Sequence, residues 1–254
     1  MPDTREHDII HAFVELSNEL VDGYDIVDLL TDWTENCARL LDVAAAGLLI
    51  ADGRGVLHLI AASSERTHYL EAIQLQRDQG PCLDSFHTGT TVSVPDLNAE
   101  SHRWPTFAGV AGSLGFASVH AVPMRLQNTV LGTLGLFGNT PGRLNDSDLA
   151  LAQALVHVAS VALVNERSAS DREVVNAQLQ HALISRVVLE QAKGVLAASG
   201  NLEIEDAFTL LRRYARGHGH KLTDVAQQLV DRDIDGHDLI EYANSTSIID
   251  AYSY

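Results

Sequence analysis

The chain has 254 residues, of which 46% are hydrophobic and 20% charged, and its formal net charge is −17 at pH 7. This composition is typical of folded globular proteins and excludes a disordered, collagen-like or low-complexity chain. The amino end has no secretory pattern, and no apolar run is long enough to span a membrane. Two cysteines, Cys37 and Cys82, are too few for a disulfide framework or a four-ligand zinc site. We therefore expect a cytoplasmic protein without membrane association.

The charge is unevenly distributed along the chain. Residues 1–174 hold 10 Arg and no Lys against 23 Asp and Glu, whereas residues 175–254 hold 7 basic residues against 11 acidic ones. Both lysines, Lys193 and Lys221, lie within residues 181–222, where six basic residues outnumber four acidic ones. An acidic body repels polyanions at long range. This distribution therefore predicts contact with nucleic acid at one locally basic module only.

The first 140 residues predict helices around an antiparallel sheet. Residues 7–22 and 25–42 place apolar side chains at helical spacing, which indicates two amphipathic helices. A hairpin is expected around the turn Asp52–Gly55, between apolar runs at 48–50 and 56–60. The next elements expected, in order, are a helix at 65–75, a loop at 78–89, an extended piece at 91–94 and a helix within 101–115. Strands at 117–124 and 129–137 follow, joined as a second hairpin by a turn at Gln127-Asn128. This order predicts an α+β domain.

From Asn145 almost fifty residues pass without Gly or Pro, which predicts one long helix over 145–199 or two collinear helices. One series of positions in this segment is spaced alternately by four and three residues and is mostly apolar, with polar interruptions. This heptad spacing favours a parallel coiled-coil homodimer over a helix packed on its own protein. The residues of this seam are Val175, Leu179, Ala182, Arg186, Leu189, Lys193 and Leu196. Two short helices at 203–216 and 222–232 and a polar tail from Gly236 complete the chain.

The basic module carries a specific set of motifs. They are Glu190-Gln191-Ala192-Lys193-Gly194-Val195-Leu196, then Ala207-Phe208 with Leu211-Arg212 and Ala215, then Leu222, Asp224, Val225 and Ala226. This stretch resembles the ANTAR domain, the three-helix RNA-binding module of bacterial transcription antiterminators. Ala197 stands where the family often has Met, which changes packing and leaves the polar motif intact. The resemblance implies binding to stem-loops of nascent RNA, which prevents a terminator hairpin from forming.

Residues 8–165 resemble a GAF domain, a small-molecule sensor module. The matching segments are LQRDQGPCLDSF, VSVPDL, RWPTF, and AVPM followed by LGTLGLF. Together the two resemblances imply a GAF-like sensor domain with an antiparallel sheet, a long coiled-coil helix and an all-α three-helix ANTAR module. The expected divisions are a sensor at 1–165, a helical linker and dimerisation segment at 166–182, the RNA-binding domain at 183–235 and a tail at 236–254. The expected partners are RNA, a second copy of the chain and a small-molecule ligand of the sensor.

Six cations are candidates for RNA phosphate contacts: Arg186, Lys193, Arg212, Arg213, Arg216 and Lys221. Lys193 and Arg212 are expected outside the core, at the rim of a groove between the first two helices of the module. The alternative is pairing within the fold, with Glu190 or with acidic residues near 203–206. Tyr214 is a candidate for stacking on a loop base, although packing is the commoner use of a helical tyrosine.

Other functions have less support in the sequence. A terminal three-helix unit with a basic second helix also fits a ligand-regulated DNA-binding regulator. Cys82 with His87 would suit a thiolate enzyme such as a GAF-type methionine sulfoxide reductase. His218 and His220 form only a weak metal motif, and no phosphate-binding loop, dinucleotide fingerprint or catalytic triad order is present. We therefore expect no enzymatic activity, metal or cofactor.

Overall fold

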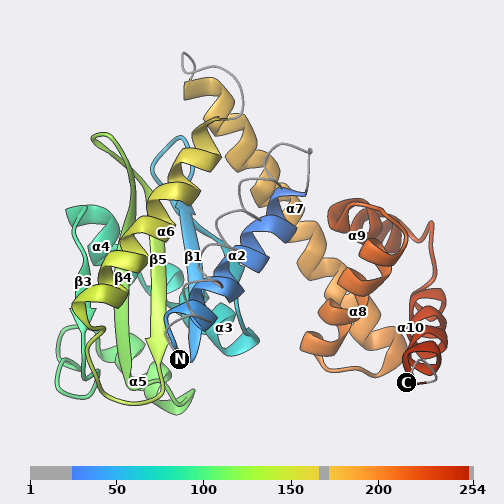
Figure 1. Cartoon of the computed structure of the whole chain (residues 1–254), viewed down its shortest axis with the longest axis horizontal. Coiled ribbons are helices and arrows are strands. Elements are labelled where there is room, and N and C mark those ends of the chain that lie inside the picture. Colours follow the sequence, from blue (N-terminus) through green and yellow to red (C-terminus); the bar gives the residue numbers. More distant parts are fainter. Residues whose placement is uncertain (1–24, 166–171, 252–254) are drawn as a thin grey trace. The chain divides into compact units, whose positions relative to one another are not determined.

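The computed structural model describes residues 25–165 and 172–251 (Figure 1). Contacts divide the described residues into two compact units, one formed by 29–165 with 172–180 and the other by 25–28 with 181–251. The helix expected at 7–22 lies outside the described residues. Within the described ranges, no helix combines the length and apolar character needed to cross a membrane.

The first unit is built on a five-stranded antiparallel sheet with the strand order β2-β1-β5-β4-β3. The strands are β1 (Ala45–Ala51), β2 (Leu57–Ala62), β3 (Val92–Val94), β4 (Ser118–Leu126) and β5 (Thr129–Gly138). Both predicted hairpins are confirmed. Asp52 closes the first turn, because its carboxylate accepts the N–H groups of Val56 at 3.0 Å and Arg54 at 2.9 Å. These hydrogen bonds hold the pKa of Asp52 well below its usual range.

Five helices belong wholly or largely to the first unit: α2 (Ile26–Leu40), α3 (Glu65–Arg77), α4 (Pro81–Thr88), α5 (Pro105–Ser113) and α6 (Asp146–Asn165). Helix α4 occupies a segment predicted as a loop, so that prediction is wrong. Pro81 fixes the first turn of α4, and Gly89 ends the helix with a φ of 64°. The sequence predicts a loop here because Gly80-Pro81 is also a common turn pair and the helix that follows is only eight residues long. Asn145 caps α6 by accepting the N–H of Asp148 at 2.9 Å.

Helices cover both faces of the sheet (Figure 1). Helix α6 contacts β4 on one face, while α3 and α4 pack against the other. Alternate strand residues, including Leu49, Val119 and Phe137, join Leu70 of α3 and Phe107 of α5 in one buried cluster. This alternation is the period-two pattern of a sheet buried against helices.

The second unit contains the described part of α7 (Arg172–Gly200) from residue 181, with α8 (Ile204–Gly217), α9 (Leu222–Asp231) and α10 (Gly236–Ala251). Small buried residues allow these helices to approach closely; they are Ala192, Ala207, Ala215 and Ala226. Helix α10 forms in the segment that the sequence analysis assigns to a polar tail without predicting its structure. Its buried Leu239 and partly buried Ile240 and Ala243 pack on the same core, which is enough apolar surface to hold a largely polar helix.

A buried carboxyl group lies in the core of the first unit. Glu71 of α3 is inaccessible to solvent, accepts a hydrogen bond from Gln74 Nε2 at 2.6 Å and lies 3.5 Å from Cys82 Sγ. Gly47 of β1 and Gly135 of β5 are cross-strand partners next to this carboxyl group. A Cβ atom would lie 2.8 Å from Glu71 Oε1 if added to Gly47 and 2.6 Å from it if added to Gly135. The two glycines therefore leave the space that this carboxyl group fills.

Burial raises the pKa of Glu71 to about 8, against the opposing effect of its hydrogen bonds to Cys82 and Gln74. The folded protein therefore keeps a proton that the unfolded chain releases near its usual pKa of 4.5. Because unfolding then liberates a proton, the free energy of unfolding falls as the pH rises from about 4.5 to about 8.

We expect Glu71→Gln to remove this pH dependence. The variant should match the wild type at pH 4 and exceed its free energy of unfolding at pH 8 by several kcal/mol, on the order of 3–5. Urea unfolding of both proteins at several pH values measures the difference. Asp78→Asn, at an exposed carboxylate just after α3, is the control and should leave the pH profile unchanged. A difference between E71Q and wild type that is constant with pH would contradict a protonated Glu71.

Candidate nucleic-acid interface

The cations of the second unit fall into an inner and an outer set. Arg186 and Lys193 of α7 are buried, with only 2% of Lys193 exposed. Arg213 of α8 is half-buried, while Arg216 and Lys221 are exposed. The expectation that Lys193 lies outside the core is therefore wrong.

One carboxylate forms ion pairs with both inner cations. Glu190 Oε1 lies 2.6 Å from Arg186 Nη2, and Glu190 Oε2 lies 3.0 Å from Lys193 Nζ. These residues are four and three positions apart on α7, so one helical face brings them together. A buried cation requires such a partner, because desolvation of an unpaired charge costs several kcal/mol. This is the internal pairing that the sequence left open for Lys193.

Phe208 of α8 joins the inner set to Arg212. Lys193 Nζ lies 5.6 Å from the centroid of the Phe208 ring, and Arg212 Cζ lies 5.5 Å from the same centroid. Both are within the range of a cation–π contact. The structure thus brings Lys193 and Arg212 to one aromatic ring between α7 and α8.

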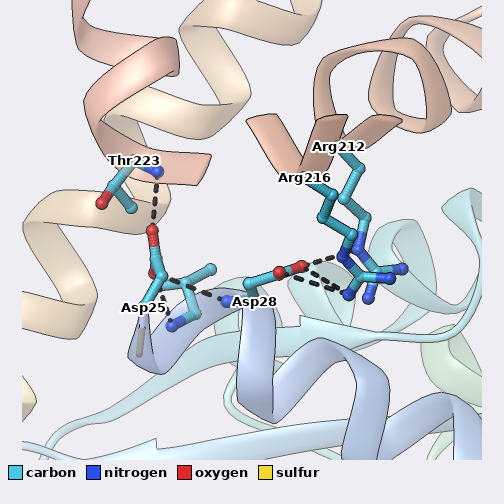
Figure 2. A network of polar contacts seen from close by, with 6 residues as sticks. Asp25, Asp28, Arg212, Arg216 and Thr223 are labelled. Atoms are coloured by element: carbon cyan, nitrogen blue, oxygen red, sulfur yellow. Dashed lines mark hydrogen bonds and ion pairs between the residues drawn. The ribbon is translucent and has the colours of Figure 1, made fainter. Parts of the chain in front are cut away.

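Two carboxylates from the start of α2 contact α8 and α9 (Figure 2). Asp28 Oδ1 lies 2.6 Å from Arg212 Nε, and its Oδ2 lies 3.2 Å from Arg216 Nη2. Asp25 Oδ2 accepts the backbone N–H of Thr223 at 2.6 Å, in the first turn of α9. From the sequence, any internal partner of Arg212 is expected near residues 203–206. The partner is instead Asp28, 184 positions away, and nothing in the sequence indicates this contact.

Tyr214 packs within the second unit. Its ring stacks on His218 with a centroid distance of 4.2 Å and meets Tyr242 of α10 edge-on at 5.4 Å. His220 follows, with its ring nearly parallel to that of His218. Among the described residues no group of three or more His, Cys, Asp or Glu side chains is arranged to hold a metal ion.

Comparison with family models decides which kind of protein this is. The GAF domain model matches residues 24–164, which is more than half of the chain. The chain belongs to the GAF family. The ANTAR domain model matches residues 177–230. A GAF domain is therefore followed by an ANTAR domain, as the sequence motifs predicted, and the antiparallel sheet followed by a helical region confirms the predicted fold class.

Two solved structures are similar to the chain at low identity. One is the GAF domain of an Acinetobacter phosphoenolpyruvate-protein phosphotransferase, at 14% identity and a TM-score of 0.49, covering 64% of this chain and 97% of that one. Another is a Neisseria meningitidis free methionine-R-sulfoxide reductase, at 16% identity and a TM-score of 0.45, covering 67% and 91%. No curated protein matches the chain.

Cys82 of the GAF domain does not have the environment of an activated nucleophile. The side chain is inaccessible to solvent, and its thiol donates to the buried Glu71 carboxyl group. Burial raises the pKa of the Cys82 thiol well above its usual value. At neutral pH the residue is a thiol and not a thiolate.

The ANTAR core occupies much of the predicted coiled-coil seam. Arg186, Leu189, Lys193 and Leu196 are buried in the described structure, and Leu189 and Leu196 belong to the ANTAR cluster. The remaining seam side chains, Val175, Leu179 and Ala182, lie outside those described. The assignment of 186–196 to an intermolecular seam is therefore wrong. Heptad spacing reports a buried helical face and does not distinguish a partner helix from neighbours in the same domain.

The two lysines make a matched pair for testing the inner set. We expect Lys193→Ala to lower the free energy of unfolding of the ANTAR domain by about 2 kcal/mol, because it removes one partner of Glu190 and leaves a gap beside Phe208. Lys221→Ala, at an exposed position, should change it by less than about 0.5 kcal/mol. Chemical denaturation followed by circular dichroism measures both. Equal stabilities of the two variants would contradict a structural role for Lys193.

Proposed function

We propose that this GAF–ANTAR protein is an RNA-binding transcription antitermination regulator whose ANTAR domain binds stem-loop RNA. One observation carries the proposal: residues 212–221, RRYARGHGHK, hold four cations and two histidines and no carboxylate, in a chain of net charge −17. This segment forms the end of α8 and the turn into α9, where Arg216, His218, His220 and Lys221 are exposed. A compact basic surface on an acidic protein directs a polyanion to one place.

The inner and outer cations support different roles within this proposal. Arg186 and Lys193 hold α7 to α8 through Glu190 and Phe208, so they position the helices. Arg213, Arg216 and Lys221 lie further out and are the candidates for phosphate contacts. The rings of His218 and His220 are candidates for stacking on unpaired loop bases, because both residues lie close to these cations in the sequence.

The GAF domain is proposed to sense a small molecule and to control RNA binding. The proposal rests on the family match over 24–164 and on the chain passing from that domain into the ANTAR domain through α6 and α7. A ligand shifts the RNA-competent population only by its differential affinity for the two states.

We further propose that the chain is a homodimer, formed through its 145–199 helical segment. Support comes from the face of α7 opposite the ANTAR core, where Ile184 and Val187 are 65% and 58% exposed and Val195 is 40% exposed. At helical spacing these three side chains share one stripe. Two such stripes packed together would remove this apolar surface from water.

The proposed function predicts selective, salt-dependent binding. The full chain should bind a labelled stem-loop RNA more tightly than duplex DNA of the same sequence in an anisotropy titration. With roughly six phosphate contacts per dimer, affinity should fall by orders of magnitude between low and physiological salt. Preference for the duplex DNA would instead favour a DNA-binding regulator.

Single cations test where the RNA binds. Lys221→Ala and Arg213→Gln should each weaken binding for all stem-loops and reduce the slope of log affinity against log salt by about 1. The control is Arg77→Gln, which removes one exposed cation from the GAF domain and should change neither quantity. Wild-type affinity in both ANTAR variants would place the RNA elsewhere.

The dimer is tested by sedimentation. The double change Ile184→Ser with Val187→Ser should produce a folded monomer at concentrations where the wild type is a dimer, because it removes most of the apolar stripe. Val56→Ser alters an exposed valine of the GAF domain and should leave the dimer intact. A wild type that sediments as a monomer while binding RNA would overturn the proposal.

A further inference from the structure

Residues 25–28 place two carboxylates on the cationic side of the ANTAR domain. Asp28 accepts from Arg212 and Arg216 of α8, and Asp25 accepts the N–H of Thr223 in the first turn of α9 (Figure 2). The side chains of Arg212 and Asp28 are 12% and 13% exposed, so this ion pair is largely shielded from water. Arg216 remains 54% exposed beside it.

Both contacts are ones that a phosphate group makes with protein. Guanidinium groups bind carboxylate and phosphate oxygens through the same N–H donors. The N–H groups in the first turn of a helix also favour an anion, and α9 is ten residues long. Lys221 immediately precedes α9 in the chain, so a cationic residue adjoins this helix end. The two aspartates therefore occupy positions that suit backbone phosphates.

An apolar contact holds the two aspartates in place. Val27, between them, is fully buried in the ANTAR core, and Ile26 packs against the same cluster. The aspartates thus act as a tethered anion whose local concentration does not depend on dilution. RNA that contacts Arg212 or the start of α9 must first displace them.

We propose that Asp25 and Asp28 form an internal phosphate mimic that competes with RNA for Arg212, Arg216 and the amino end of α9. The inference rests on the proposed RNA binding and adds its regulation. Any event that withdraws residues 25–28 would free these anion sites for the RNA backbone.

Asp28→Asn in the full chain tests this competition. Its affinity for a fluorescent stem-loop RNA should exceed that of the wild type by roughly tenfold, which is the scale of one charge-assisted contact removed from a competitor. Its slope of log affinity against log salt should be steeper by about 1, because guanidinium groups no longer paired with Asp28 hold counterions that RNA releases.

Asp42→Asn is the matched control. Asp42 is exposed just after α2 with a φ of 51°, a conformation that Asn tolerates, and the change removes the same charge. Circular dichroism melts establish that each variant is folded. If D28N does not fold, Asp25→Asn replaces it, since Asn is as good a cap for α2 as Asp and lacks the charge facing α9.

The outcomes separate the two proposals. Tighter binding and a steeper salt slope in D28N but not in D42N support the mimic, as does RNA binding by D28N when the wild type binds none. Equal affinities and slopes in D28N, D42N and wild type overturn the mimic and leave the proposed function standing. No RNA binding by any of the three at low salt overturns both.

Discussion

The ANTAR domain depends on the carboxylate of Glu190, which forms ion pairs with two buried cations of a small helical core. Removal of this carboxylate would leave Arg186 and Lys193 without an ion-pair partner that lowers their cost of burial, which destabilises a fold by several kcal/mol. With it, α7 presents Lys193 to Phe208 of α8, and the small residues Ala192 and Ala207 bring the two helices close. These polar residues of the motif therefore stabilise the fold of the domain, whether or not they also contact a ligand.

This arrangement separates cations that hold the fold from cations that face solvent. The inner cations are paired with Glu190, and Arg212 is held by Asp28. Arg216 also contacts Asp28 but is 54% exposed, and Lys221 is exposed at the start of α9. We expect substitutions in the two sets to have different consequences: loss of an inner cation should lower stability, and under the proposed function loss of an outer one should lower the affinity for RNA.

The GAF domain uses a buried carboxyl group in a different way. Glu71 has hydrogen bonds from Gln74 and Cys82 and no cation among its described hydrogen-bond and ion-pair partners, so burial raises its pKa and keeps it protonated. Space for it comes from Gly47 and Gly135 in neighbouring strands. The two domains thus use acidic side chains differently: the partly exposed Glu190 forms ion pairs with cations, whereas the buried Glu71 is neutral.

Local patterns in the sequence predicted most of the fold. The hairpins at Asp52 and Gln127, helix α2 and the helices of the ANTAR domain follow from short-range periodicity and turn chemistry. Helix α4 was missed because Gly80-Pro81 reads as a turn, and α10 because only a few of its residues supply the apolar face. The period of α7 identified its buried face but not what covers it.

The candidate site was less accessible to sequence reasoning, since it depends on contacts between distant residues. Lysine is usually a surface residue, so the sequence predicts Lys193 outside the core. Its burial depends on contacts with Phe208 and Glu190 that only the structure shows. Asp28 meets Arg212 across 184 positions, and a pair of aspartates in an ordinary helix start carries no signal of that contact. The family motifs identified the domain, whereas the roles of its cations required the structure.

The most direct test of the account is to map where RNA touches the chain. Ultraviolet crosslinking of a stem-loop RNA to the full protein, followed by mass spectrometry of the crosslinked peptides, reports the contact residues without altering the protein. If RNA binds the basic segment, crosslinks will fall within residues 212–221, at the end of α8 and the turn into α9. Crosslinks confined to residues 25–164, with none in the ANTAR domain, would contradict it.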